Sequence, residues 1–448
     1  MKSFPKIVVF ICALLSVVHA QNLPPCTIPG AITHSCSIAQ GTYTVASTIT
    51  ISQSDILIKC LPGATLVQGM NTSIFRVTGN NVTIDGCVFD ANNQSIPEAN
   101  GALVAYGTNG FVLRNCTVKN VIGDSNAGVW LKKTSNSLIE KNTLLGPSGG
   151  VLAVGSEDTL QIINNRVTGQ IWIQSQADSD SGPSASIVVS GNIITPTLNG
   201  TGGCGLVQDA SSSTTKPIQD FTFSHNICRI HGTDASHHVF GAFSLVSNNS
   251  GTCTVANNVV EAYGQYVDYA LWEIGLTGCA FSGNLTRGGG DTNNQNYHGW
   301  VIYSGNNTFT GNNTVGWGAN GAGMTFYPQN LSAPYANNNV VTGGSLIASP
   351  TGATGYIGLN IACNVPGSSI QNLKVSGLLI SGAFKRGVNS EGDHGPHCPV
   401  SMTLDSVTIS GATVGIQTYT TTIGVQNVYT IGVPTRWVQE PNTVVIIP

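Results

Sequence analysis

The sequence predicts an all-β protein, folded as a single parallel β-helix (β-solenoid) with about ten or more coils. Three observations predict this fold. Short segments that open with Gly, or with a residue in its place, alternate apolar and variable residues along most of the chain. Short Asn-containing motifs recur in phase with these segments, and long helical patterns are absent. A repeated strand-and-turn unit is typical of a solenoid, in which each coil buries its apolar face against its neighbours.

The Gly-led segments are the expected strands. Side chains alternate across a strand, so the first and third residues after the leading one, which are mostly apolar, should point into the coil. The second and fourth should then face outward. The segments begin at Gly101, Gly128, Gly150, Gln170, Gly205, Gly241, Ala270, Gly299, Gly323, Gly358, Gly387 and Gly415.

The Asn-containing motifs follow these strands and predict a ladder of turns. Asn tolerates a left-handed backbone and can hydrogen-bond along a stack of identical side chains. Asn that merely marked loops would explain the composition but not the regular spacing. The motifs are Arg114-Asn115-Cys116, Lys141-Asn142, Asn164-Asn165, Gly191-Asn192, His225-Asn226, Asn257-Asn258, Gly283-Asn284, Gly311-Asn312 and Asn338-Asn339.

The first twenty residues predict a secretory signal peptide. Lys2 and Lys6 precede an apolar core at 7–17, and Val18-His19-Ala20 is a small-residue cleavage signal. We therefore expect a secreted protein with a signal peptide at 1–20. Because no linker divides the repeats, we expect one β-helix at 46–432. An uncapped solenoid end would expose apolar cross-section and strand edges, so we expect an N-terminal cap at 21–45 and a C-terminal cap or tail at 433–448.

Composition and charge narrow the possible partners. Only 8% of the residues are charged and the formal net charge is −4, while 41% are hydrophobic and 54 residues are Gly. The absence of a basic run excludes nucleic acid as the expected partner. The apolar run at the N-terminus is too short to span a membrane comfortably, and no later stretch is long enough. We expect a monomer.

The cysteines suggest bonds between neighbouring coils. Cys60, Cys87 and Cys116 occupy matching phases, as do Cys253 and Cys279. Neighbouring strands lie about 4.8 Å apart, within the reach of a disulfide, although a stack of buried free thiols is equally compatible. Two further pairs, Cys26–Cys36 and Cys363–Cys398, are candidates for disulfides that hold loops. No CxxC pair is present, so we expect no structural zinc site.

The expected outer face of the repeated strand carries an aromatic strip where a solvated sheet should be polar. A large apolar patch on a soluble protein usually marks an interaction surface, and aromatic rings stack on sugar rings. We therefore expect a polysaccharide or oligosaccharide to bind there; aromatics covered by loops, or a protein interface, are the alternatives. The substrate-binding candidates are Trp130, Lys132, Trp172, Gln174, Phe243, Trp272, Tyr303 and Tyr327.

With these repeats, the whole mature chain resembles the right-handed parallel β-helix proteins of the pectate-lyase-like superfamily. The resemblance implies three parallel sheets, a substrate groove along one of them, and action on acidic polysaccharides. It identifies no particular family, because the Asn-Thr-Asp, Asp-Asp, Gly-His-Gly and Arg-Ile-Lys motifs of polygalacturonases are missing. The Asp cluster of pectate lyases and the Asp-Pro-His motif of mannuronan epimerases are missing as well.

Titratable residues are scarce, so their concentration between His225 and His298 is informative, and oversized loops in these coils are suited to carry function. We expect a secreted polysaccharide-active enzyme, first a lyase that cleaves a glycan containing uronic acid by β-elimination. It would use Arg287 or Lys132 to neutralise the uronate and His231, His237 or His238 to remove the C5 proton. A glycoside hydrolase would use two carboxylates, from Asp209, Asp234, Asp268 and Glu273. Glu273 occupies an odd strand position and is expected to point inward. The catalytic candidates are Asp209, His231, Asp234, His237, His238, Asp268 and Arg287.

A second cluster follows Lys385-Arg386, where Asp393, His394 and His397 have the chemistry of metal ligands. A solvated turn explains this spacing better, so we assign no metal site. We expect no required cofactor; a divalent cation such as calcium, which could neutralise a uronate, is the alternative. A secreted carbohydrate-binding protein without catalysis is the non-enzyme alternative, because binding needs only the aromatics and polar neighbours.

Overall fold

The computed structural model describes residues 23–94, 101–122, 127–155, 157–175, 184–196, 203–209, 217–232, 239–247, 249–264, 267–288, 298–318, 320–328, 336–348, 356–362, 368–391, 399–419, 421–439 and 444–446. Within these ranges every regular element is a β-strand. No helix in them is long and apolar enough to cross a membrane. The chain forms two compact units: unit 1 comprises 1–152 and 158–166, and unit 2 comprises 153–157 and 167–448.

Each strand pairs in parallel with the strand three places further along the chain, which is the connectivity of a parallel β-helix with three strands per coil. In unit 1, sheet A contains β1 (Cys36–Ile38), β4 (Leu57–Cys60), β7 (Thr83–Asp85), β10 (Val112–Arg114), β13 (Ser135–Glu140) and β16 (Asp158–Ile163). Sheet B contains β2 (Gly41–Val45), β5 (Ala64–Gln68), β8 (Val88–Asp90), β11 (Thr117–Lys119) and β14 (Thr143–Leu144). Sheet C contains β3 (Ile49–Ile51), β6 (Phe75–Val77), β9 (Gly101–Tyr106) and β12 (Ala127–Lys132). Two strands, β15 (Val151–Val154) of sheet C and β17 (Arg166–Val167) of sheet B, contain residues of both units.

Unit 2 repeats the same cycle. Its sheet A contains β19 (Ala185–Ser190), β22 (Ile218–Ser224), β25 (Asn249–Ala256), β28 (Ala280–Ser282), β31 (Thr308–Thr310), β34 (Val340–Thr342), β37 (Ile370–Ser376), β40 (Val400–Asp405), β43 (Thr421–Gln426) and β46 (Val444–Ile446). Its sheet B contains β20 (Ile193–Ile194), β23 (Ile227–Gly232), β26 (Val259–Gly264), β29 (Leu285–Gly288), β32 (Asn313–Val315), β35 (Ser345–Ile347), β38 (Leu379–Ser381), β41 (Thr408–Ser410) and β44 (Tyr429–Ile431). Its sheet C contains β18 (Ile171–Ser175), β21 (Gly205–Asp209), β24 (Val239–Val246), β27 (Val267–Ile274), β30 (His298–Ile302), β33 (Ala322–Phe326), β36 (Ile357–Ala362), β39 (Arg386–Glu391), β42 (Val414–Thr418) and β45 (Thr435–Gln439).

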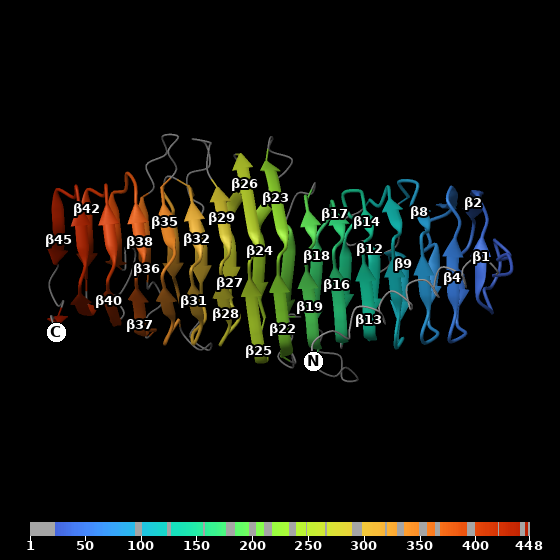
Figure 1. The fold of residues 1–448 in the computed structure, drawn as a ribbon, viewed down its shortest axis with the longest axis horizontal. Coiled ribbons are helices and arrows are strands. Elements are labelled where there is room, and N and C mark those ends of the chain that lie inside the picture. Colours follow the sequence, from blue (N-terminus) through green and yellow to red (C-terminus); the bar gives the residue numbers. More distant parts are fainter. Residues whose placement is uncertain are drawn as a thin grey trace, which may run out of the picture. The chain divides into compact units, whose positions relative to one another are not determined.

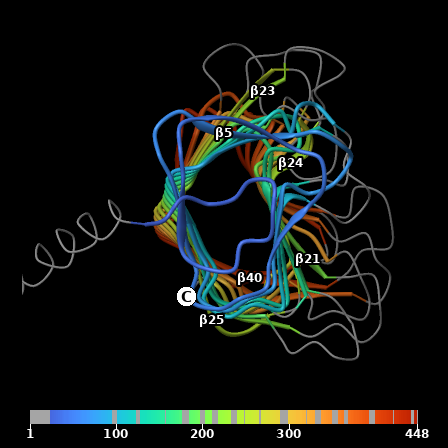
Figure 2. The same cartoon turned by 90° about the vertical axis from the view of Figure 1, so that its right-hand side faces the viewer.

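Successive strands of unit 2 lie side by side from green to red in Figure 1. In the end-on view, β23, β24 and β25 bound three sides of a common interior (Figure 2). That interior is filled by apolar side chains, among them Phe223, Phe243 and Trp272, which are buried and in ring contact. The all-β, parallel β-helix predicted from the repeats is confirmed.

The predicted Asn ladder is confirmed, and it lies inside the coil rather than on its surface. In unit 2, successive side-chain amides donate to the Oδ1 atom of the next coil, as from Asn226 to Asn258 at 3.1 Å and from Asn258 to Asn284 at 2.9 Å. The same Oδ1 atoms also accept a backbone N–H, at 2.9 Å for Asn226 and 3.0 Å for Asn258. Each buried amide therefore satisfies backbone groups where the strands of sheet A turn into sheet B.

The predicted ladder motif Asn338-Asn339 belongs to a different stack of Asn residues. The Asn339 Oδ1 atom accepts the N–H of Asn307 at 3.0 Å, and Asn338 donates to the side chain of Asn306 at 3.0 Å. These residues precede β31 and β34, so they form a second stack where sheet C leads into sheet A. The sequence could not separate the two corners, because both need a residue that tolerates positive φ.

Two disulfides join neighbouring coils at matching phases, as the sequence suggested: Cys60–Cys87 and Cys253–Cys279. The predicted Cys26–Cys36 bond, a candidate for holding a loop, is also formed. A fourth bond, Cys204–Cys228, was not predicted, because its cysteines occupy different phases of the repeat. Cys363 and Cys398 lie outside the described residues.

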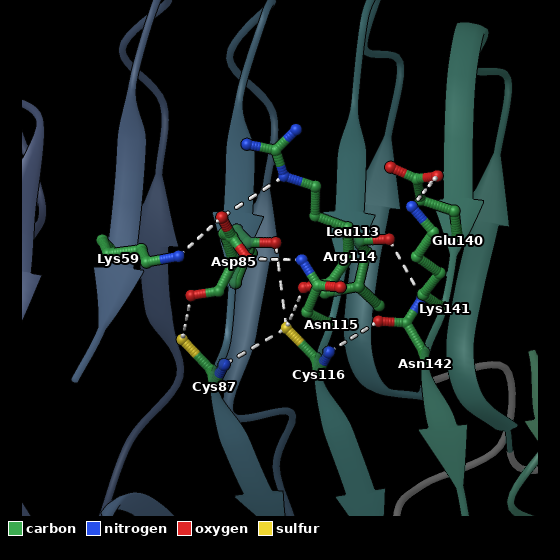
Figure 3. A network of polar contacts seen from close by, with 11 residues as sticks. Lys59, Asp85, Cys87, Leu113, Arg114, Asn115, Cys116, Glu140, Lys141 and Asn142 are labelled. Atoms are coloured by element: carbon green, nitrogen blue, oxygen red, sulfur yellow. Dashed lines mark hydrogen bonds and ion pairs between the residues drawn. The ribbon is translucent and has the colours of Figure 1, made fainter. Parts of the chain in front are cut away.

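Cys116 is a buried free thiol and takes the position that Asn occupies in the ladder of the next coils, where its backbone N–H donates to Asn142 Oδ1 at 2.9 Å (Figure 3). Burial raises the pKa of this thiol to about 12. The thiol is therefore in its unreactive protonated form.

The segments expected to be caps contain strands of the sheets. β1 and β2 lie within 21–45, while β45 and β46 lie within 433–448. They pair in parallel with their neighbours, as in the register of Ile38 with Cys60 and of Thr418 with Gln439. A capping role for these segments, and a single domain between them, remain predictions.

Candidate active site on the outer face of sheet C

The strand register of unit 2 places one row of side chains along the outer face of sheet C. Ser244 in β24 is paired with Glu273 in β27, which is paired with Val301 in β30. The row continues through Thr325 in β33 to Asn360 in β36. The preceding and following residues of these strands, such as Trp272 and Ile274, are buried in the interior. Glu273 therefore faces outward, and the expectation that it points inward is wrong.

Glu273 is held by hydroxyl groups on both carboxylate oxygens. Ser244 donates to Oε2 at 2.5 Å, and the Tyr303 hydroxyl lies 3.2 Å from Oε1. The Tyr303 hydroxyl is also hydrogen-bonded to that of Tyr269, at 2.7 Å. Tyr327 packs beside Tyr303, with ring centroids 6.2 Å apart. Although it faces outward, the Glu273 side chain is only slightly exposed.

This environment raises the pKa of Glu273. Burial penalises the carboxylate and is the largest effect, while the hydrogen bonds from Ser244 and Tyr303 oppose it. Burial also raises the pKa of Tyr269 to about 12, and it raises that of Tyr303. The cluster therefore favours a protonated carboxyl, which can donate a proton to a bound group and then be stabilised as a carboxylate by the same hydroxyls.

His298 adds a neutral ring to the cluster. Its Nδ1 atom accepts the backbone N–H of Ala322 at 3.1 Å and lies 3.1 Å from the Thr325 hydroxyl. A donor at Nδ1 assigns the ring proton of the neutral imidazole to Nε2, so Nε2 is a hydrogen-bond donor. Burial lowers the pKa of His298 to about 4, which keeps the ring neutral near neutral pH. The ring lies 6.1 Å from that of Tyr269.

Two residues of the predicted aromatic strip, Phe243 and Trp272, point into the coil rather than outward. Phe243 and Trp272 are fully buried, and Trp272 stacks on Trp300 with centroids 4.7 Å apart. The Trp272 indole N–H donates to Thr286 at 2.9 Å inside the coil. In the sequence-based prediction these two segments start at Gly241 and Ala270, one residue too early. The register pairs Trp272 with Trp300, which directly follows Gly299, so the residue equivalent to Gly299 is Leu271 rather than Ala270. A one-residue slip exchanges the two faces of a strand.

The other strip residues lie on the outer face, within their own units. In unit 2, Trp172 and Gln174 of β18 are half-buried, and Tyr303 and Tyr327 flank Glu273. In unit 1, Trp130 and Lys132 of β12 face outward, with the Lys132 ammonium 6.0 Å from the indole ring. The Nε1 atom of Trp172 is buried and has no hydrogen-bond partner in the described residues. Such a donor is suited to an acceptor on a bound ligand.

The predicted catalytic residues do not form one described cluster. Arg287 lies on the outside of sheet B, where it pairs with Glu261 at 3.5 Å, and Arg229 pairs with the same carboxylate at 3.0 Å. Asp209 and Asp268 lie in strands of sheet C, and His231 lies in β23 of sheet B, but their side chains fall outside the description. Asp234, His237 and His238 lie entirely outside the described residues.

Sequence reasoning missed Ser244, Tyr269 and His298 as members of the site. From the sequence, Glu273 is a candidate carboxylate for hydrolysis that is expected to point inward. The available signal was the equivalence of Trp272 and Trp300, since aligning the two segments on these aromatics places Glu273 on the outer face. The Gly-led alignment was ambiguous there, because Ala270 and Leu271 can both stand in the position of Gly299.

A separate charged network lies on the outer face of sheet A in unit 1 (Figure 3). Asp85 pairs with Lys59 at 2.8 Å and with Arg114 at 3.3 Å, and it accepts a hydrogen bond from Asn115 at 2.9 Å. Burial raises the pKa of Asp85, but these hydrogen bonds and cations outweigh it, and the pKa is lowered. A carboxylate so fully paired is suited to joining coils rather than to proton transfer.

No group of three or more His, Cys, Asp or Glu side chains that could hold a metal ion occurs among the described residues. The stretch from Asp393 to His397, which has the chemistry of a metal site, lies outside them.

Comparisons with known proteins support the fold. A family model described as a right handed beta helix region matches residues 44–226. This match and the three parallel sheets of the structure support a right-handed parallel β-helix. No curated protein sequence matches the chain significantly.

Similar solved structures include a PL6 alginate lyase in complex with a trisaccharide, at 14% identity and a TM-score of 0.46, covering 94% of this chain and 83% of that one. The catalytic domain of a GH87 α-1,3-glucanase with nigerose has 15% identity and a TM-score of 0.43, covering 95% and 69%. An exopolygalacturonase from Thermotoga maritima has 10% identity and a TM-score of 0.36, covering 89% and 84%. Likeness at this level concerns the fold alone and carries no argument about activity.

Proposed function

We propose that the protein is a secreted, polysaccharide-active enzyme that cleaves a glycosidic bond by acid–base catalysis at Glu273. The observation that carries the proposal is the outward-facing carboxyl, with its raised pKa, held between Ser244 and Tyr303. Carboxyls with a perturbed pKa and hydroxyl partners are suited to proton transfer. The aromatic side chains of the same face supply surfaces on which sugar rings stack.

In the proposed step, protonated Glu273 donates its proton to the oxygen of the bond that breaks. The carboxylate left behind keeps its hydrogen bonds from Ser244 and Tyr303, which lower the cost of its negative charge in a buried site. The neutral His298 ring offers its Nε2–H to a sugar hydroxyl.

The sequence favours β-elimination from a glycan that contains uronic acid, in which the C5 proton is lost and a double bond forms as the C4–O bond breaks. Glu273 would protonate the leaving oxygen, and one of the predicted histidines, His231, His237 or His238, would take the C5 proton. Hydrolysis is the second candidate, because a raised carboxyl pKa also fits a general acid that works with a second carboxylate.

Secretion is part of the proposal. Disulfides form and persist in oxidising compartments, and the described residues contain four of them. The apolar segment and cleavage signal at 1–20 are consistent with export. A monomeric state and any role for calcium remain predictions.

The test is turnover of a panel of acidic and neutral polysaccharides, followed by reducing ends and by the ultraviolet absorbance of an unsaturated uronate. We expect Glu273→Gln to lower kcat by about 10²- to 10⁴-fold, because general acid catalysis contributes that much. Glu261→Gln, on sheet B, is the control and should retain activity. Unsaturated products identify a lyase, and reducing ends without them identify a hydrolase. Full activity of the Glu273→Gln variant would overturn the proposal.

A further inference from the structure

The geometry points to an anion-binding subsite on the outer face of sheet C in unit 2, formed by Lys385, Arg386, Tyr356, Asn360 and Asn389. Its ligand is an anionic substituent of the glycan, either a carboxylate or a sulfate ester. This inference rests on the proposed function, because it names the chemical class of the substrate that reaches Glu273.

The amides of this subsite are fixed by one another and by a cation. Asn389 donates from Nδ2 to Asn360 Oδ1 at 2.9 Å, and Arg386 donates to Asn389 Oδ1 at 3.2 Å. Asn389 is 1% exposed and Asn360 is half-buried. Because Asn360 Oδ1 accepts from Asn389, the orientation of the Asn360 side-chain amide is fixed, with Nδ2 as its donor end. Preorganised donors of this kind bind anionic oxygens without paying again for ordering.

Two cations lie over one aromatic ring beside these amides. The Lys385 ammonium lies 4.5 Å from the Tyr356 ring centroid and donates to the Tyr356 hydroxyl at 3.0 Å. The Arg386 guanidinium lies 5.6 Å from the same centroid. Lys385 forms no ion pair within the described residues. A carboxylate or sulfate between the two cations would relieve their mutual repulsion and gain charge-assisted hydrogen bonds.

The subsite lies in register with the proposed catalytic residue. Asn360 and Asn389 extend the outer row that begins with Ser244 and Glu273 and passes through Thr325. β36 is three strand spacings from β27, so Asn360 lies about 14 Å from Glu273 along the sheet. A glycan chain of a few sugar residues can span that distance.

The net negative charge of the protein makes Lys385 and Arg386 important for binding an anionic glycan. The protein carries 21 Asp and Glu against 17 Lys and Arg, so its average field repels a polyanion. An anionic glycan therefore needs a local positive site on the binding face. The adjacent cations Lys385 and Arg386 provide one on the face that carries Glu273.

The test measures binding rather than turnover. Calorimetric titrations in the Glu273→Gln background would use a uronate oligosaccharide, its carboxyl-reduced neutral form, and a sulfated neutral oligosaccharide. We expect Lys385→Gln combined with Arg386→Gln to weaken binding of an anionic ligand by about tenfold to a hundredfold, because each charged hydrogen bond contributes strongly. The neutral form should bind more weakly to the parent protein and should be unaffected by the variant. Preference for the carboxylate or for the sulfate then identifies the anion.

Lys374→Gln is the matched control, because Lys374 is an exposed lysine of β37 on sheet A. It should leave all affinities unchanged. The single variant Lys385→Gln, at an exposed side chain, keeps the test valid if the double variant unfolds. Equal affinity of parent and Lys385→Gln proteins for all three ligands would overturn the inference. Failure of the proposed function would instead appear as unimpaired turnover by Glu273→Gln, which leaves these binding results standing.

Discussion

At Glu273, two opposing effects of the surroundings determine the protonation state. Burial favours the neutral carboxyl, whereas Ser244 and Tyr303 stabilise the ionised one, and burial is the larger effect. A carboxyl facing the outside of a solenoid would ordinarily be solvated. Here Tyr269, Tyr303 and Tyr327 pack around it, so that the same aromatic residues that suit a sugar also remove water from the acid.

The first prediction concerns pH and stability. The folded protein binds a proton at Glu273 more tightly than the unfolded chain does, because the folded pKa lies above the ordinary value of 4.5. The stability of the parent protein should therefore fall as pH rises from about 4.5 through the folded pKa. Glu273→Gln cannot ionise and should avoid this loss. Its melting temperature relative to the parent should rise across that interval and then level off.

The lowered pKa of His298 changes stability with pH in the opposite direction to Glu273. Because His298 is present in both proteins, its contribution cancels when their melting temperatures are compared. Its pKa of about 4 is below the ordinary 6.5, so it costs stability as pH falls through that interval. A difference in melting temperature that stays constant with pH would show that Glu273 titrates normally in the folded state.

At the scale of single strands, the sequence-based prediction and the structure differ in which residues of some sheet C strands face the interior. The alternation of apolar residues identified the interior side correctly in β12, β18, β30 and β33. It failed in β21, β24 and β27. In β21 the register pairs Leu206 with the outward-facing Trp172 and Ser244, so Leu206 faces outward and Val207 inward. In β24 and β27, Gly241-Ala242 and Ala270-Leu271 offer two candidates for the position of the leading Gly. Register shifts occur at the start of both strands, between Val239 and Gly241 in the pairing of β24 with β27. An irregularity of this kind breaks the simple period of two.

The second prediction compares a tryptophan on the inner face of sheet C, Trp272, with one on its outer face, Trp172. Trp272→Ala should lower the free energy of unfolding by about 3–5 kcal/mol, because it leaves a cavity in the core and removes the partner of Thr286. Trp172→Ala should preserve stability far better and should weaken oligosaccharide binding. Urea unfolding and calorimetric titration measure the two effects. Loss of binding in neither variant would argue against a saccharide surface at β18.

The third prediction concerns the buried Asn ladder. Asn258→Ala removes the acceptor of the Asn226 backbone N–H and the donor to the Phe223 carbonyl, leaving both buried groups unpaired. We expect the free energy of unfolding to fall by about 2–4 kcal/mol, since each unsatisfied buried group costs about 1–3 kcal/mol. Asn257→Gly is the control, because Asn257 is exposed and has a φ of 56°, which Gly adopts readily. Comparable losses in the two variants would mean that the turn, rather than the ladder, carries the stability.

At the scale of the whole chain, periodicity is the part of the structure that the sequence expresses most strongly. The Gly-led strands and Asn turns predicted the parallel β-helix, because every coil must satisfy the same backbone groups and fill the same interior. The site was predictable only in part. Glu273, Tyr303 and Tyr327 were named from the sequence, but Tyr269 and His298 join them through contacts between coils that no local pattern encodes. Arg287, chosen for its charge, is paired with Glu261 on sheet B.

A further consequence of the solenoid is that contacts join adjacent coils, so a local change should have local effects. The Cys253–Cys279 disulfide joins β25 to the coil of β28 across 26 residues of sequence. In the loop-entropy description, its removal costs about 3.5 kcal/mol. The double variant Cys253→Ser and Cys279→Ser should therefore lose hydrogen-exchange protection mainly in β22, β25, β28 and β31. The amides of unit 1, such as those of β4 and β7, should keep theirs. Because Cys60–Cys87 lies in unit 1, replacing both of those cysteines with Ser is the reciprocal control and should reverse the pattern. Equal loss of protection in both units from either variant would show that the chain unfolds as one cooperative body rather than by segments of neighbouring coils.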